Sequence, residues 1–329
     1  MHDLLEGLKA VAEPTRLRLL ALLARAELTV TEITQVLQQS QPRVSRHLRL
    51  MVEAGLLRRF PEGTWVFYRL AEDGPAAGLA RAIDALIDKD DPVLAEDAAR
   101  LAAIRKARAA EAAEYFAENA DRWSEIRALY LPEEAVEQAI ADMLGPKRIG
   151  TLLDLGTGTG RILEVLGPRA DRAIGIDTSH EMLSIARANL ERAGLAHAQV
   201  RYGNMLRLDP GALGVMPQAD VAVLHHVLHF LEHPQEAVVE AARLVAPGGR
   251  MLIADFAPHA LEHLRESHAH RRLGFSDREV QAWAENAGLV LAETRDLPPA
   301  GAIGAQLTVK LWLLEKPKGA ATRRAGEAA

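Results

Sequence analysis

The chain has 329 residues, of which 49% are hydrophobic and 26% charged, and its formal net charge is −6. This composition is typical of a globular protein, and the length predicts two domains rather than one. Cysteine is absent, which excludes disulfides, thiolate metal sites and a cysteine nucleophile. The charged N-terminal segment and the lack of a long apolar run predict a cytoplasmic protein with no signal peptide and no membrane span.

Basic charge gathers in the first part of this acidic chain. Between Ser40 and Arg69 there are six arginines and two glutamates. Such a cluster is expected where a protein contacts the phosphates of nucleic acid.

A helical pattern underlies this basic segment. Residues 31–37 predict a short helix and residues 38–40 a turn, after which Ser40 is placed to cap a second helix. The second helix has a predicted core face made of apolar residues at three- and four-residue spacing, namely Val44, Leu48, Met51 and Val52. Residues 58–60 and 65–68 then flank a glycine-containing turn and predict a β-hairpin.

Helix, turn, helix and basic hairpin together describe a mostly α-helical winged helix-turn-helix domain over residues 1–75, which predicts binding to double-stranded DNA. Arginine and glutamine are side chains that read base edges in the major groove. The predicted DNA-binding residues are Gln41, Arg43, Ser45, Arg46, His47 and Arg49 on the helix and Arg58 and Arg59 on the hairpin. A winged scaffold that contacts protein instead of DNA is the alternative.

Three stretches of this domain, residues 12–20, 44–48 and 53–56, resemble the ArsR/SmtB family of winged-helix repressors. The resemblance covers about residues 3–75 and implies a homodimer bound to an inverted-repeat operator. Many metalloid sensors of that family carry cysteines in the segment written here as Glu27–Thr31. Because this chain has no cysteine, and only His2 and His47 before residue 180, we expect a regulator that does not sense metal.

Residues 76–145 predict a helical dimerisation or linker region without strands. One apolar stripe comprises Leu79, Ile83, Leu86 and Ile87, and a second comprises Leu94, Leu101 and Ile104. The sequence Asp90-Asp91-Pro92 separates them, since the residue before proline avoids the helical conformation. The first stripe is a dimerisation candidate. Four aromatic residues then predict either a lid or a packing face against the next domain: Tyr115, Phe116, Trp123 and Tyr130.

The most specific motif begins at Leu152. An apolar strand ends in Asp154, glycines follow at positions 156, 158 and 160, and a second apolar strand ends in Asp177. Glycines permit a sharp backbone turn close to a ligand, and the second acid is placed to accept ribose hydroxyls. The unit predicts binding of an adenosine-containing ligand at residues 146–317.

The D-x-G-x-G-x-G spacing resembles motif I of class I methyltransferases that use S-adenosyl-L-methionine (SAM). Further matching segments are residues 203–205, 219–226 and 244–255. The resemblance implies an α/β Rossmann-like fold with a mostly parallel seven-stranded sheet, and SAM as the cofactor with S-adenosylhomocysteine as product or effector. It assigns cofactor binding to Asp154, Gly156, Thr157, Gly158, Gly160, Asp177, Thr178, Met182, Asn204, Met205 and His225.

Histidines dominate the predicted acceptor side. His225 and His226 follow the fourth strand, where a histidine is a candidate general base because it titrates near neutral pH; the alternative is that His225 only lines the methionine pocket. His225, His229 and His233 would form a zinc site only if a continuous helix stacked them, and we expect no metal because Pro234 breaks such a helix. Weaker acceptor-pocket candidates are His259, His263, His268 and His270.

Two functions of different classes fit this organisation. In the first, a DNA-binding regulator methylates an unidentified small molecule; in the second, a repressor senses SAM or S-adenosylhomocysteine with little or no turnover. Arsenite methylation is excluded, because that chemistry binds arsenic through cysteine thiolates. Residues 318–329 are small and charged and predict a disordered tail.

Overall fold

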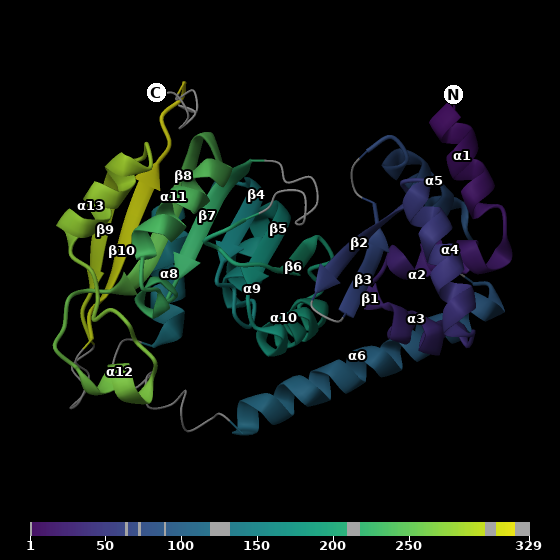
Figure 1. The fold of residues 1–329 in the computed structure, drawn as a ribbon, viewed down its shortest axis with the longest axis horizontal. Coiled ribbons are helices and arrows are strands. Elements are labelled where there is room, and N and C mark those ends of the chain that lie inside the picture. The colour runs from purple at the N-terminus through teal and green to yellow at the C-terminus, as the bar shows by residue number, and fades with distance from the viewer. Residues whose placement is uncertain are drawn as a thin grey trace, which may run out of the picture. The chain divides into compact units, whose positions relative to one another are not determined.

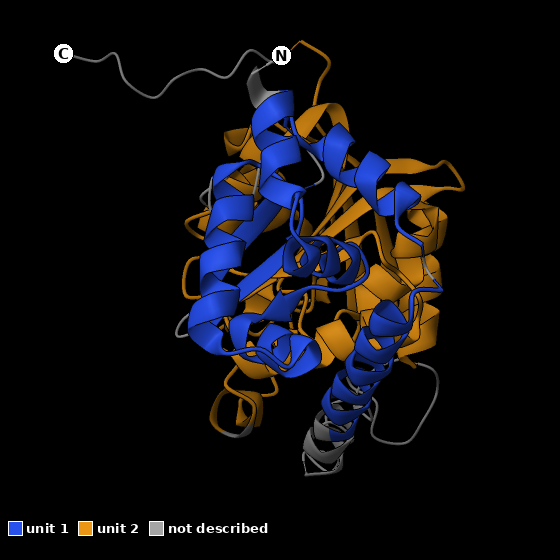
Figure 2. Ribbon diagram, turned by 90° about the vertical axis from the view of Figure 1, so that its right-hand side faces the viewer, with its two compact units in different colours: residues 1–111, 209–216 blue, residues 112–208, 217–329 orange. Residues whose placement is uncertain are grey.

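The computed structural model describes residues 2–62, 65–71, 74–88, 90–118, 132–208, 218–299 and 307–319. The chain divides into two compact units (Figure 2). The described residues of the first lie within 1–111, and those of the second within 112–208 and 217–329. Of the predicted aromatic group, Trp123 and Tyr130 lie outside the described residues, as do the side chains of Tyr115 and Phe116 and the predicted tail from residue 320.

The first unit is mostly helical with one small sheet (Figure 1). Its elements are α1 (His2–Val11), α2 (Pro14–Leu23), β1 (Leu28–Thr29), α3 (Val30–Leu37), α4 (Gln41–Glu53), β2 (Leu57–Glu62), β3 (Trp65–Leu70), α5 (Ala77–Leu86) and, as far as residue 111, α6 (Pro92–Glu118). Strands β2 and β3 form the predicted antiparallel hairpin, and β1 pairs with the other edge of β3. The predicted winged helix-turn-helix architecture is confirmed.

Local hydrogen bonds explain where these helices begin. Thr29 and Glu32 form a reciprocal capping box at the start of α3. Ser40 occupies the N-cap position of α4 as predicted, but its side chain makes no capping hydrogen bond. Helix α6 begins at Pro92, and the carboxylate of Asp91 accepts hydrogen bonds from the two backbone N–H groups that follow this proline.

Partly buried ion pairs hold α6 against helices α2 and α3. Arg18 of α2 makes two hydrogen bonds of 2.7 Å to the carboxylate of Asp97. Further along α6, Arg108 is bonded to both carboxylate oxygens of Glu32 at 2.9 Å. Leu101 lies between these pairs and is buried in the core of the first unit. Residues 92–108 are therefore an integral part of the first unit.

The second unit is built on a seven-stranded sheet (Figure 1). Its elements are α8 (Glu133–Leu144), β4 (Ile149–Leu155), α9 (Arg161–Leu166), the 3₁₀ helix η1 (Gly167–Arg169), β5 (Ala170–Asp177), α10 (His180–Arg192), β6 (Ala198–Tyr202), β7 (Ala219–His225), the 3₁₀ helix η2 (Leu228–Phe230), α11 (Pro234–Leu244), β8 (Val245–Phe256), α12 (His263–Ser267), α13 (Asp277–Asn286), β9 (Val290–Leu297) and β10 (Val309–Glu315).

The strand order is β6-β5-β4-β7-β8-β10-β9, and only the β10 pairings are antiparallel. The chain moves outward from β4 through β5 to β6 and then returns to β7 on the other side of β4. This reversal opens a crevice at the carboxyl ends of β4 and β7, where ligands bind in open α/β sheets. The predicted Rossmann-like class I methyltransferase fold is confirmed.

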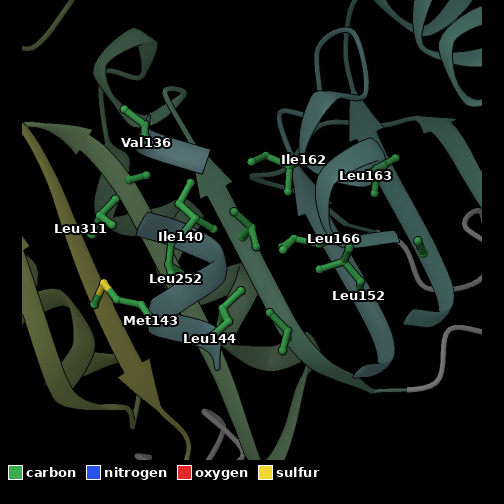
Figure 3. Close-up of a cluster of buried hydrophobic side chains, with 14 of the residues drawn as sticks. Val136, Ile140, Met143, Leu144, Leu152, Ile162, Leu163, Leu166, Leu252 and Leu311 are labelled. Atoms are coloured by element: carbon green, nitrogen blue, oxygen red, sulfur yellow. The ribbon is translucent and has the colours of Figure 1, made fainter. Parts of the chain in front are cut away.

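The core of the second unit lies between this sheet and helices α8, α9 and α10. Figure 3 shows Ile140 and Met143 of α8 beside Leu252 and Leu311 of the sheet, and the leucines of α9 near Leu152. At the start of α13, Ser276 and Glu279 form a capping box. No helix among the described residues is long and apolar enough to cross a membrane.

Candidate functional site

Helix α4 presents a polar surface over a buried face. Val44, Leu48 and Met51 are buried as predicted, whereas Val52 is only half-buried. Exposed along the rest of the helix are the predicted residues Gln41, Arg43, Ser45, Arg46 and Arg49. On the adjoining hairpin Arg59 is exposed and Arg58 half-buried.

His47 differs from the other predicted DNA contacts. Its side chain is 13% exposed, and its Nδ1 lies 3.8 Å from a carboxylate oxygen of Glu13, the N-cap residue of α2. Burial lowers the pKa of His47, although Glu13 opposes this shift. The geometry ties His47 to the packing of α4 on α2, away from the exposed surface.

The glycine-rich loop closes tightly over the ends of β4 and β5. The backbone N–H groups of Gly156 and Thr157 both donate to the carbonyl of Ile176, at 2.8 and 3.0 Å. The N–H of Gly158 donates to Oδ2 of Asp177 at 2.9 Å, and Oδ1 of Asp177 accepts from the N–H of Ser179. Asp177 therefore orders the loop, and each oxygen keeps a further lone pair for a ligand.

Two glycines of the loop serve different needs. Gly156 (φ +74°) lies at the crevice between β4 and β7, where a Cβ would come within 2.4 Å of Val227 Cγ2. Gly158 (φ +51°) faces open space, since a Cβ there would have no described atom within 4 Å. The backbone at Gly158 can thus contact a ligand directly.

Asp154 lies beneath the loop. It is 1% exposed, and Thr157 Oγ1 donates to its Oδ2 at 2.5 Å. Burial raises the pKa of Asp154 to about 7, although the Thr157 hydrogen bond opposes the shift. Neither Asp154 nor Gly160 lines the cavity described next, so among the predicted cofactor residues these two support the loop instead of facing a ligand.

A cavity of about 680 Å³ opens at the carboxyl edge of the sheet. This volume is within the range of cofactor sites. Its lining includes the other predicted cofactor residues: Gly156, Thr157, Gly158, Asp177, Thr178, Met182, Asn204, Met205 and His225. Oδ1 of Asn204 already accepts the N–H of Leu206, which leaves the amide Nδ2 as the free donor for a purine edge.

Five histidines line the cavity as well: His225, His226, His229, His268 and His270. Burial lowers the pKa of His225 to about 4 and that of His270 to about 3, and it lowers the pKa of His226 well below its usual value. These three imidazoles are therefore neutral at physiological pH. A histidine with a pKa near 4 accepts a proton poorly, which weakens the predicted role of His225 as a general base.

His229 has a dedicated partner in Asp255. The carboxylate of Asp255 is fully buried and lies 2.8 Å from Nδ1 of His229. It also accepts hydrogen bonds from the backbone N–H groups of Leu228, His229 and Phe256. Burial raises the pKa of Asp255, but His229 and these hydrogen bonds outweigh it, so the pKa is lowered overall. The ionised Asp255 fixes the ring of His229.

The structure tests two expectations about the histidines, and the first, that no continuous helix stacks His225, His229 and His233, is confirmed. His225, His229 and His233 do not share a helix face, because β7 ends at His225, η2 spans Leu228–Phe230 and α11 begins at Pro234. His233 is exposed at the N-cap of α11. Among the weaker acceptor candidates, His268 and His270 line the cavity, whereas His259 and His263 do not.

Several lining residues escaped sequence reasoning, namely Glu133, Thr159, Arg161, Phe230 and Phe256. Arg161 carries a usable signal, since it follows the last glycine of the motif at the N-terminus of α9. It makes two hydrogen bonds, of 2.6 and 2.7 Å, to the buried carboxylate of Glu137. These bonds raise the pKa of Arg161. The positions of Phe230 and Phe256 follow only from tertiary packing.

Two family models match the chain. Residues 13–59 match the model described as "Bacterial regulatory protein, arsR family", and residues 153–253 match the model described as "Methyltransferase domain".

Curated relatives match each region separately. The arsenic resistance transcriptional regulator ArsR1 of Pseudomonas putida is 41% identical over 95 residues, covering 29% of this chain and 73% of that protein. The arsenical resistance operon repressor of Escherichia coli is 46% identical over 69 residues, but the match spans only 59% of its length. The demethylmenaquinone methyltransferase of Thermus thermophilus is 37% identical over 120 residues, which span 34% of this chain and about half (49%) of that enzyme.

Among solved structures, a putative methyltransferase of Bacillus halodurans aligns with a TM-score of 0.45 and 17% identity, covering 56% of this chain and 99% of that protein. The regulatory relationship rests on the sequence matches and on the winged architecture, and the methyltransferase relationship on the family model and the strand order. The chain therefore belongs to the arsR family of bacterial regulatory proteins and carries a methyltransferase domain C-terminal to its arsR-family region.

Proposed function

We propose that this protein is a transcriptional regulator whose second unit binds SAM and transfers its methyl group to a small molecule. One observation carries the proposal. A glycine-rich loop with an open backbone at Gly158, and an acid at the end of the next strand, border one end of a cavity of about 680 Å³. That combination fits an adenosine-containing ligand.

Different residues of the cavity would contact different parts of SAM. Asp177 would accept ribose hydroxyls, Asn204 and Met205 would contact the adenine, and Gly156 to Gly158 would lie against the amino-acid portion of SAM. SAM supplies an electrophilic methyl group on a sulfonium. The protein then has mainly to hold the acceptor in line with that methyl group. Neutral His225 is suited to accepting a hydrogen bond from the acceptor, which positions its nucleophilic atom.

Titration of the full chain with SAM by calorimetry tests this proposal. We expect saturable binding of one SAM per chain, and its loss in Gly158→Val, because the new side chain fills space that the ligand needs. Gly194→Val is the matched control, since Gly194 also has positive φ (+69°) and no described atom within 4 Å of a Cβ, yet it does not line the cavity. Equal SAM affinity in Gly158→Val and the wild type would refute the proposed site.

For the first unit we propose binding to operator DNA as a homodimer. The exposed arginines of α4 and the hairpin support DNA contact, and exposed leucines on α1 and α5 support dimerisation. Leu4, Leu5 and Leu8 are 48%, 48% and 43% exposed, and Leu86 is 85% exposed. The other three residues of the predicted stripe on α5 are not available to a partner subunit, because Leu79, Ile83 and Ile87 pack on the unit's own core.

A second candidate function is sensing, in which SAM or S-adenosylhomocysteine changes the affinity for DNA with little turnover. It is favoured by the presence of an arsR-family region and a methyltransferase domain in one chain. Coupling of about 1–3 kcal/mol is typical of allosteric proteins. Fluorescence anisotropy of the protein's own upstream DNA at fixed salt, with and without each ligand, distinguishes the two: a change in affinity of about five-fold or more indicates a sensor, and indifference to both ligands removes this candidate.

A further inference from the structure

The histidine-lined end of the cavity has the features of a metal site that the sequence did not lead us to expect. One potential ligand atom from each of His226, His229 and Asp255 lies within 4.8 Å of the other two. His226 directly follows β7, His229 lies in η2 and Asp255 lies at the end of β8, so the fold assembles the group from three segments.

Within this group, Asp255 supports His229 and is not itself a proposed ligand of the ion. Both of its oxygens are already engaged, by backbone N–H groups and by Nδ1 of His229. That bond leaves Nε2 as the nitrogen of His229 that a ligand can reach. A carboxylate that fixes the rear nitrogen of a histidine is the arrangement found behind histidines that ligate metals, where it sets the tautomer and raises the basicity of the ligand.

His270 supplies a third imidazole. It is 3% exposed and lines the cavity, and within the described part of the chain neither of its ring nitrogens has a hydrogen-bond partner. A buried polar group without a partner is costly unless a ligand satisfies it. The ring centroids of His229 and His270 lie 4.2 Å apart, and those of His226 and His229 lie 6.3 Å apart. The ligand atoms that already lie within 4.8 Å of one another do not include one of His270, so its ring would have to rotate toward an ion shared with His226 and His229.

Backbone strain is concentrated at the same place. Three non-glycine residues among those described have positive φ, and two of them, His226 (+50°) and Ala269 (+58°), line this cavity. His226 is held in that conformation by its backbone N–H, which donates to the carbonyl of Ala254 at 2.8 Å. Strained residues persist where the surrounding structure enforces them, and they cluster at functional sites.

We propose that His226, His229 and His270, with Asp255 behind His229, bind a divalent transition-metal ion of the Zn²⁺ class at the acceptor end of the cavity. Imidazole ligands favour such ions over Mg²⁺ and Ca²⁺, which prefer oxygen. Three protein ligands leave a coordination position open. That position would take an oxygen or nitrogen of the methyl acceptor, a role that rests on the proposed function, whereas binding of the ion itself does not.

The test is titration of untagged, chelator-treated full-length protein with Co²⁺, a spectroscopic substitute for Zn²⁺, followed by visible absorption. We expect one ion per chain, with the intense visible bands of a tetrahedral site, and competition by Zn²⁺. His226→Asn keeps a residue that tolerates positive φ, and His270→Phe keeps the ring that stacks near Phe256. Each variant should lower the Co²⁺ affinity ten-fold or more, as the loss of even a supporting group does in known sites.

His233→Asn is the matched control, because His233 belongs to the same segment but is exposed outside the cavity. It should bind Co²⁺ like the wild type. SAM titration of every variant shows whether the cavity is intact, so that failure of the metal site and failure of the SAM site are told apart. Absence of saturable Co²⁺ binding in the wild type, or an equal loss in His233→Asn, would overturn the proposal.

Discussion

Asp154 shows how a single residue beneath the cofactor loop makes stability depend on pH. Burial raises its pKa from 3.8 to about 7. The native state therefore keeps a proton that the unfolded chain releases between about pH 4 and pH 7. The contribution of this residue to the free energy of unfolding falls as the pH rises through that window, by at most about 4 kcal/mol.

Asp154→Asn removes this titration while an amide oxygen can still accept the hydrogen bond from Thr157. We predict that the free energy of unfolding of the variant, relative to that of the wild type, increases from pH 5 to pH 8. Urea unfolding of both full-length proteins at the two pH values measures the gain. A stability difference that is the same at both pH values would show that Asp154 is ionised in the native state throughout.

Helix α4 is the element that we expect to read DNA. Arg46→Ala should weaken binding to the upstream DNA by about 1–3 kcal/mol if the guanidinium contacts a base edge. Arg278→Ala, which removes an exposed arginine from α13 of the second unit, should leave the affinity unchanged. Anisotropy titrations at one salt concentration compare the two, and an unaffected Arg46→Ala would remove α4 from the reading role.

Helix α1 is the element that we expect at the dimer interface. It passes close to α5 at Gly7, where a Cβ would lie 2.5 Å from Leu79 Cδ2, and it leaves Leu8 exposed. A charge at Leu8 would be buried without a partner in a dimer, so Leu8→Glu should shift the protein toward monomer in sedimentation equilibrium. Val290→Glu, at an exposed valine of the second unit, is the control. A dimer that tolerates Leu8→Glu would place the interface elsewhere.

At the scale of the whole molecule, the sequence predicted those features of the fold and the site that depend on short-range residue patterns. The helix-turn-helix, the hairpin, the glycine loop and Asp177 all follow from short-range spacing, and so does the position of His225 at a strand end. The residues that escaped prediction depend on distant pairings. Asp255 meets His229 across 26 positions, and Phe256 reaches the cavity because β8 lies beside β7. Three of the four residues in the predicted apolar stripe along α5 pack on the unit's own core, because periodicity shows an apolar face but not which surface covers it.

The central claim is that one chain holds DNA and SAM together, and retention of labelled SAM on immobilised upstream DNA tests it most directly. We predict that DNA-bound wild-type protein retains about one SAM per chain and that Gly158→Val stays on the DNA without label. With Arg46→Ala, neither the protein nor the labelled SAM should stay on the DNA. Wild-type protein that stays on the DNA without labelled SAM, or label that persists in Gly158→Val, would contradict the account.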